Sequence, residues 1–200
     1  LLGAPTVLVD PNAGPAAIAD GLLHAARRLA CDVVALVDVG GDVLAHGDEP
    51  GLSSPLCDAV LLAAAPALAR ALPTVGVVFG AGCDAELTPT EVLERVAEVA
   101  AAGGLLGAWG LTPDAADELA RAVDAVPTEA SAQALACARG AWGPQPIRGG
   151  RRTVERTPVG AIAFFFDPAA ALASAARCAR RVLGADDLEA AQGRLAAAGI

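Results

Sequence analysis

The chain has 200 residues, of which 14 are basic and 23 acidic, so its net charge at pH 7 is −9. This charge argues against nucleic acid and against an anionic membrane surface as partners, because both attract basic proteins. All 14 basic residues are arginine, so the sequence offers no lysine for a Schiff base or for a phosphate-binding P-loop.

Short apolar strands alternate with amphipathic helices along the sequence. In chain order we expect a strand at 6–9, a helix at 15–30, a strand at 32–38, a helix at 54–72, a strand at 74–79, a helix at 88–103, helices beginning at 112 and 128, a loop at 143–152, strands at 151–156 and 159–166, and helices at 168–183 and 187–198. Residues 105–111 fit neither pattern clearly. Helix starts are marked by capping residues, such as Thr88 with Glu91 three positions later.

This order predicts a single α/β domain over residues 1–200, with 143–152 as a loop within it. Because the strands are continuous apolar runs, we expect a parallel sheet with helices on both faces. An all-helical bundle is the alternative, but the strand segments are too rich in β-branched residues to favour it.

The five cysteines are widely spaced and form no Cys-x-x-Cys or zinc pattern, which indicates buried thiols in a reducing compartment. No apolar run reaches the ~18 residues of a membrane span, and no signal peptide is recognisable. We therefore expect a cytoplasmic protein with no membrane partner.

A polar loop follows the expected strand at 32–38 and is the strongest functional signal in the sequence. Its residues 38–49, here called the acidic loop, are Asp-Val-Gly-Gly-Asp-Val-Leu-Ala-His-Gly-Asp-Glu. In open α/β sheets, ligands bind beside the carboxyl ends of strands. The Gly40–Gly41 pair would let the backbone approach a ligand closely.

We expect Asp38, Gly40, Gly41 and Glu49 to bind the ligand, with Asp38 and Asp42 as metal ligands. Asp42 and His46 are the candidate catalytic residues; Asp48 and Glu49 lie close to His46 in sequence, and a neighbouring carboxylate can orient the ring as a general acid or base. The alternative for His46 is a solvent-exposed loop histidine.

Other expected strands also end in carboxylates. Asp10 and Asp167 follow two of them, and Asp84 and Glu86 follow the strand at 74–79. Clustered carboxylates repel one another, so such an edge is held by Mg²⁺ or Ca²⁺, by arginine, or by backbone N–H groups. For Asp10 and Asp167 we favour a simpler role as caps of the following turn or helix.

Three segments carry a likeness to a known family. The stretch VDVGGDVLAHGDEPGLSSPLCDAVLLAA resembles the signature of domain of unknown function 1152, and the helix TEASAQALACARG and the tail from TPVGAIAFFFDP to Ile200 resemble later parts of that family. The resemblance implies a Rossmann-like α/β fold and brings no activity. It also implies that this chain is a fragment lacking the family's N-terminal, glycine-rich part.

Three functions are consistent with these patterns. The first is a small-molecule enzyme, of hydrolase or lyase type, whose acidic loop binds a divalent metal such as Mg²⁺. The second is a non-catalytic module that binds a nucleotide or metabolite. The third is a structural or assembly protein, in which the Gly-Gly pair merely turns the chain.

Overall fold

The computed structural model describes residues 3–200. The helices are α1 (Gly14–Arg28), α2 (Leu56–Leu68), α3 (Pro89–Ala101), α4 (Pro113–Ala125), α5 (Glu129–Ala138), α6 (Pro168–Ala173), α7 (Arg177–Val182) and α8 (Leu188–Ala196). The strands are β1 (Val34–Val39), β2 (Thr74–Phe79), β3 (Leu105–Gly110), β4 (Gly143–Ile147), β5 (Arg152–Arg156) and β6 (Ile162–Phe166). Short 3-10 helices lie at η1 (Pro11–Ala13), η2 (Asp42–Leu44), η3 (Arg148–Gly150) and η4 (Pro158–Ala161).

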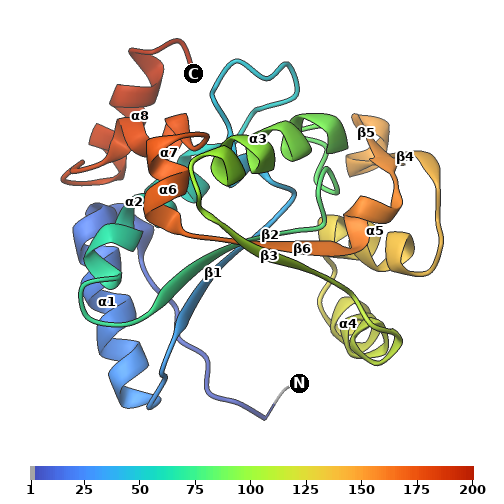
Figure 1. The fold of residues 1–200 in the computed structure, drawn as a ribbon, viewed down its shortest axis with the longest axis horizontal. Coiled ribbons are helices and arrows are strands. Elements are labelled where there is room, and N and C mark those ends of the chain that lie inside the picture. The colour runs from blue at the N-terminus through green and yellow to red at the C-terminus, as the bar shows by residue number, and fades with distance from the viewer. Residues whose placement is uncertain (1–2) are drawn as a thin grey trace.

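The α/β class is confirmed, but the sheet is mixed instead of parallel. Its four strands have the order β1-β2-β6-β3, and β4 and β5 form a separate hairpin. Strands β1 and β2 are parallel, whereas β6 runs antiparallel to both of its neighbours (Figure 1). The prediction of a Rossmann-like parallel sheet is therefore wrong at β6, which is antiparallel to its neighbours.

The connection between β3 and β6 explains the direction of β6. A parallel pair needs a crossover that carries the chain back along the whole strand. Here two helices, α4 and α5, pack against each other after β3 and are followed by the β4–β5 hairpin. This excursion ends at η4, where the Leu111 N–H after β3 donates to the Ala161 carbonyl, so the chain re-enters the sheet at the end where β3 left it.

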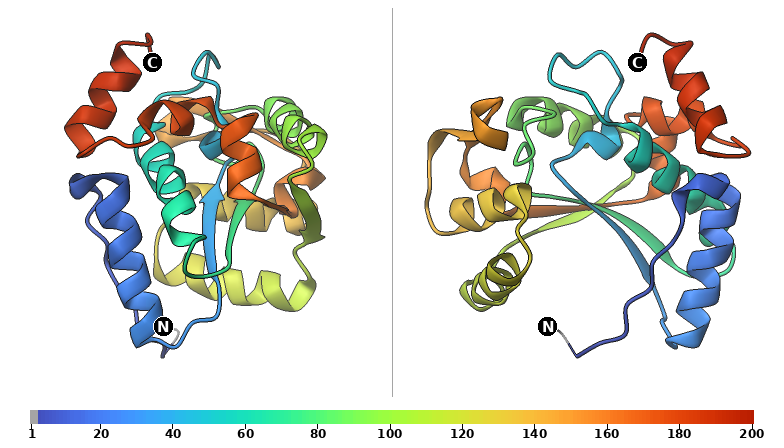
Figure 2. Two further views of the ribbon diagram at one scale, coloured as in Figure 1. Left: turned by 60° about the vertical axis from the view of Figure 1, so that its left-hand side comes forward. Right: turned by 180° about the vertical axis from the view of Figure 1, so that it is seen from behind.

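Helices do not cover both faces of the sheet completely. Helices α2, α3 and α6 contact its strands, while β3 is exposed along its whole length and Val37 projects from β1 into solvent. Two further views show α1, α2 and α6–α8 gathered at one end of the molecule, and α4, α5 and the hairpin at the other (Figure 2). Apolar contacts between α2 and its neighbours form the main core.

Residues 6–9 do not form the expected strand. They are extended, and Leu8 is 99% exposed. Within residues 3–200, β1 pairs only with β2 and is therefore an edge strand. A β-branched run alone does not make a strand, because it needs a partner for its backbone groups.

Other segments also differ from expectation, among them the expected strand at 159–166, which begins only at Ile162 because Pro158–Ala161 form η4. The expected loop at 143–152 contains β4 and η3, and the expected helix at 168–183 is divided into α6 and α7. At the division, Ser174 leaves the helical conformation while its hydroxyl donates to the carbonyl of Ala170. The buried residues Ala175 and Ala176 then pack into the core.

The capping box expected at the start of α3 is confirmed. The Thr88 hydroxyl accepts the N–H of Glu91, and the Glu91 carboxylate accepts the N–H of Thr88. None of the helices in residues 3–200 is both long and apolar enough to cross a membrane.

Candidate functional site

Five carboxylates gather where β1 and β2 end. Val39 and Phe79 are paired at these ends, and the turns that follow are joined because Gly82 N–H donates to the carbonyl of Gly40 at 2.7 Å. The carboxylates, here called the acidic cluster, are Asp38 of β1, Asp42 of η2, Asp58 of α2, and Asp84 and Glu86 of the loop between β2 and α3. Parallel β1 and β2 thus bring together side chains that are far apart in sequence.

Glycine at position 40 is what admits Asp84 to this cluster. Gly40 has φ +143°, and a Cβ there would lie 2.2 Å from Cγ of Asp84 and within 2.5 Å of both its oxygens. Gly41, at φ +117°, is confined in the same way by Val92, whose side chain would be 2.7 Å from an added Cβ. The Gly-Gly pair therefore makes room for one carboxylate and for the helix α3 behind it.

Asp38 has one oxygen engaged by the acidic loop. Its Oδ2 accepts the N–H of Gly41 at 2.8 Å and that of Val43 at 3.4 Å. Burial, followed by the charges of Asp58 and Asp84, raises the pKa of Asp38 to about 7. The other oxygen accepts no hydrogen bond from residues 3–200.

Asp42 lies at the centre of the cluster and has no partner within the described chain. It is 5% exposed, and its carboxylate accepts no hydrogen bond from residues 3–200. Burial and then the charge of Asp38 raise the pKa of Asp42 to about 9. Its oxygens are not among the fully buried side-chain atoms that lack a partner, so they can be reached by a ligand that brings positive charge to this acidic surrounding.

Asp42 belongs to two groups of closely spaced acids. Ligand atoms of Asp38, Asp42 and Asp58 lie within 4.8 Å of one another, and so do those of Asp42, Asp84 and Glu86. Burial raises the pKa of Asp58, and also raises that of Asp84 to about 6. Asp84 Oδ1 accepts the N–H of Glu86 at 3.1 Å, which leaves Oδ2 for a ligand.

Glu86 differs from the other four acids because its oxygens are already satisfied. Oε2 accepts the N–H groups of Ser53 and Ser54, both at 2.9 Å, and Oε1 accepts both serine hydroxyls. Burial alone would raise the pKa of Glu86, but the bonds from the two serines and the charge of Arg152 outweigh it and lower the pKa. We therefore assign Glu86 to holding the serine turn in place and not to the ligand set.

Arg152 ties the β4–β5 hairpin to the same turn. Its guanidinium donates to the carbonyls of Gly51 and Ala85 and to the Ser53 hydroxyl, and lies 3.8 Å from Glu86. Sequence patterns do not predict this contact, because nothing local in the sequence connects Arg152 to a loop about a hundred residues earlier.

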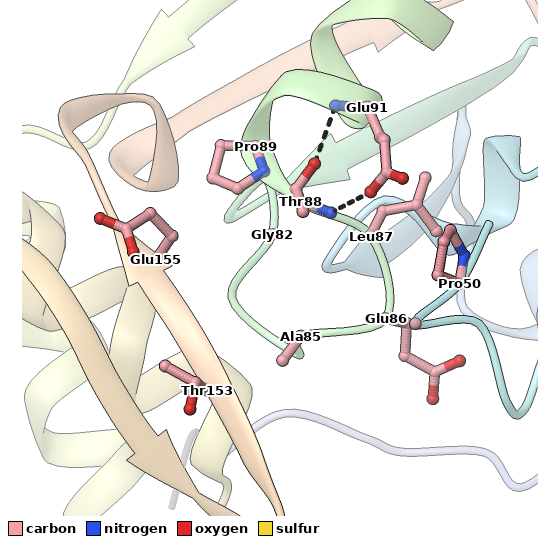
Figure 3. Close-up of a pocket in the computed structure, with 11 residues that line it drawn as sticks. Pro50, Gly82, Ala85, Glu86, Leu87, Thr88, Pro89, Glu91, Thr153 and Glu155 are labelled. Carbon is pink, nitrogen blue, oxygen red and sulfur yellow. Dashed lines mark hydrogen bonds between the residues drawn. The ribbon is translucent and has the colours of Figure 1, made fainter.

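Two cavities flank the acidic cluster. One, of about 160 Å³, lies between the loop before α3 and strand β5 (Figure 3). In it the Glu86 carboxylate points away from Thr153 and Glu155, and the polar groups of Thr88 and Glu91 are bound to each other. The other, of about 150 Å³, lies between α1, β1 and α2 and is apolar apart from Asp38 and Asp58. This second cavity therefore has access to the cluster.

His46 and Glu49 lie in a second polar group against α3. The His46 ring nitrogen Nε2 is 2.9 Å from Glu98 and 2.8 Å from Arg95. Glu49 accepts the N–H groups of His46 and Gly47, both at 2.8 Å, and lies 3.3 Å from the Arg95 guanidinium. The side chain of His46 has no hydrogen bond to the acidic cluster in the described structure.

The structure thus brings together part of the predicted site. Asp38 and Asp42 meet beside Gly40 and Gly41, whereas His46 and Glu49 are held apart from them. Asp58 was not predicted, although its position in the first turn of the helix after the acidic loop is a usable signal. Asp10 and Asp167 cap a 3-10 helix and α6, respectively, as expected.

Comparison with known proteins gives one result. No curated protein and no solved structure matches the chain. The model of a family described as protein of unknown function (DUF1152) matches residues 1–200. The chain therefore belongs to this family.

Proposed function

We propose that the acidic cluster binds one divalent cation and that the protein is a cation-dependent small-molecule enzyme, of hydrolase or lyase type. The observation that carries this proposal is Asp42, which is 5% exposed and lacks a donor among residues 3–200. A cation would supply the missing positive charge. Asp38 and Asp58 share one group of closely spaced ligand atoms with Asp42, and Asp84 shares a second group with it, so these three acids are the further ligands in the proposal.

The donor chemistry favours a hard cation. Carboxylates are the ligands that Mg²⁺ and Ca²⁺ prefer, whereas structural zinc sites use cysteine and histidine, which the cluster lacks. Mg²⁺ is the first candidate. When bound, such a cation polarises a carbonyl or phosphoryl oxygen or activates a water molecule.

The residues of the chain have distinct roles in this proposal. Asp38 is oriented by the N–H groups of Gly41 and Val43, which fixes one of its oxygens and leaves the other for the cation. Gly40 admits Asp84. The apolar cavity that ends on Asp38 and Asp58 is the space in which a small substrate would meet the cation.

Thermal unfolding with Mg²⁺, Mn²⁺ or Ca²⁺ tests the proposal. A cation present at one hundred times its Kd stabilises the native protein by about 2.7 kcal/mol, which raises Tm by several degrees. We expect this rise in the unaltered chain and in Asp48→Asn, a matched change of an exposed acid in the same loop, but not in Asp42→Asn.

Two results would count against the proposal. Absence of a shift with all three cations would contradict the cation site, and a shift that persists in Asp42→Asn would place the cation elsewhere. A shift without turnover of any phosphate ester, amide or hydroxy acid would favour the non-catalytic binding module.

A further inference from the structure

Two buried thiols from distant parts of the chain meet beside η4. Cys83 lies in the loop between β2 and α3, and Cys137 lies near the end of α5. The two residues are 1% and 5% exposed, respectively. They form a small apolar cluster with Ala134, separate from the main core. The chain's other cysteines lie elsewhere, with Cys31 and Cys57 exposed.

Gly160 leaves the space that both sulfur atoms use. A Cβ at position 160 would lie 2.8 Å from Sγ of Cys137 and 3.0 Å from Sγ of Cys83. Both sulfurs therefore converge on one point, and any larger residue would separate them. This packing is more specific than that of an ordinary buried cysteine, which needs only apolar neighbours.

We propose that Cys83 and Cys137 form a reversible disulfide when the protein meets a peroxide, linking the loop that carries Asp84 to helix α5. Both sulfurs lie within 3.0 Å of the same point beside Gly160 and belong to one buried cluster, so the side chains need to move only a short way to bond. The inference does not depend on the cation site, because it concerns two thiols that the proposed function does not use.

The chemistry balances with hydrogen peroxide as the oxidant. The Cys137 thiolate attacks one peroxide oxygen, the O–O bond breaks, and the departing hydroxide takes up a proton to give water and a Cys137 sulfenic acid. The Cys83 sulfur then attacks the Cys137 sulfur, loses its proton and releases the second water. Two thiols are oxidised to one disulfide, and one peroxide is reduced to two waters.

The surroundings favour Cys137 as the attacking sulfur. The neighbouring Cys83 thiol, together with the backbone at Thr157 and the charge of Arg156, lowers the pKa of Cys137 to about 7 against the opposing effect of burial. At neutral pH a substantial share of Cys137 is then thiolate, the nucleophilic form.

The test is mass mapping of the native protein after treatment with hydrogen peroxide, followed by denaturation, alkylation and digestion. We expect a linked peptide pair containing Cys83 and Cys137, lighter by two hydrogens and separated by dithiothreitol. Cys178, which is also buried but lies beside Gly47, serves as the control and should remain fully alkylatable. Recovery of Cys83 and Cys137 as free thiols would overturn the proposal.

Two conservative variants test the order of attack. In Cys83→Ser the reaction should stop at the sulfenic acid, so that dimedone labels Cys137. In Cys137→Ser, dimedone should leave Cys83 unlabelled. Labelling of Cys83 in the second variant, or no labelling of Cys137 in the first, would contradict the assigned roles.

Discussion

Asp42 is the residue at which stability conflicts with the proposed function. A carboxylate that is buried among four others costs free energy unless it is protonated or binds a cation. Natural proteins keep such residues where they serve a site, at the expense of stability. The cost of burying these carboxylates can be measured, because it determines how the stability of the cation-free protein depends on pH.

Stability without cation should fall as the pH rises. The folded pKa of Asp42 is raised to about 9 and that of Asp38 to about 7, both above the ordinary value near 3.8. A raised folded pKa contributes stability that is present below the unfolded pKa and is lost as the pH rises through the folded pKa. We expect Tm, measured by calorimetry with a chelator present, to decrease from pH 5 to pH 9.

Asp42→Asn provides the control for this effect. Because the amide cannot ionise, its Tm at pH 8 should be higher than that of the unaltered chain, and its decrease with pH should be smaller. Cation and protons compete for the same oxygens, so the rise in Tm with Mn²⁺ should be larger at pH 8 than at pH 6. A cation effect that weakens between pH 6 and pH 8 would contradict the carboxylate ligand set.

Gly40→Ala should damage the site more than its small size suggests. The added Cβ would lie 2.2 Å from the Asp84 carboxyl carbon. The alanine would also have to keep a φ of +143°, which residues with a side chain rarely adopt. We expect a loss of about 1–3 kcal/mol in the free energy of unfolding, measured with urea. Mn²⁺ binding should be lost as well, because Asp84 must move.

Gly103→Ala is the matched change outside the site. Gly103 also has a positive φ, but an added Cβ meets nothing within 4 Å. It should cost about 1 kcal/mol from backbone strain alone and leave Mn²⁺ binding intact. Equal loss of Mn²⁺ binding in both variants would mean that the effect of position 40 is not local.

At the scale of elements, some helices and strands around the site can be predicted from local sequence and others cannot. The start of α3 was predictable because the capping box of Thr88 and Glu91 is local. The division between α6 and α7 was not, since alanine-rich sequence favours a continuous helix and the break depends on packing of Ala175 and Ala176. The direction of β6 depends on how α4 and α5 pack, which no local pattern records.

The β4–β5 hairpin should be held to the site by Arg152. Its guanidinium makes bonds to Gly51, Ala85 and Ser53 and neutralises part of the Glu86 charge. Arg152→Gln should lower the free energy of unfolding by about 1.5–3 kcal/mol, as for loss of hydrogen bonds from a charged group. Urea denaturation measures this loss.

Arg151→Gln is the control for the hairpin. Arg151 is the neighbour of Arg152 in sequence and is exposed, and its side chain donates only to the carbonyl of Arg148 among residues 3–200. This change should alter the free energy of unfolding by no more than about 0.5 kcal/mol. If both variants lost the same stability, Arg152 would have no special part in joining the hairpin to the site.

At the scale of the whole molecule, sequence patterns were sufficient for the α/β class and for the gathering of carboxylates at the strand ends. Asp38 and Asp42 were predictable because they share one short loop, and Asp84 because it follows a second strand. Asp58 and the bonds of Glu86 depend on the tertiary approach of α2 and the serine turn. The separation of His46 from Asp42 likewise depends on α3, which places Arg95 and Glu98 beside the ring.

The most direct measurement is a crystal structure of the protein soaked with Mn²⁺, with anomalous diffraction used to locate the ion. We expect one strong peak, bound by Asp42 together with Asp38, Asp58 and Asp84. A peak beside His46 and Glu49 only, or no peak in the acidic cluster at saturating Mn²⁺, would contradict this expectation.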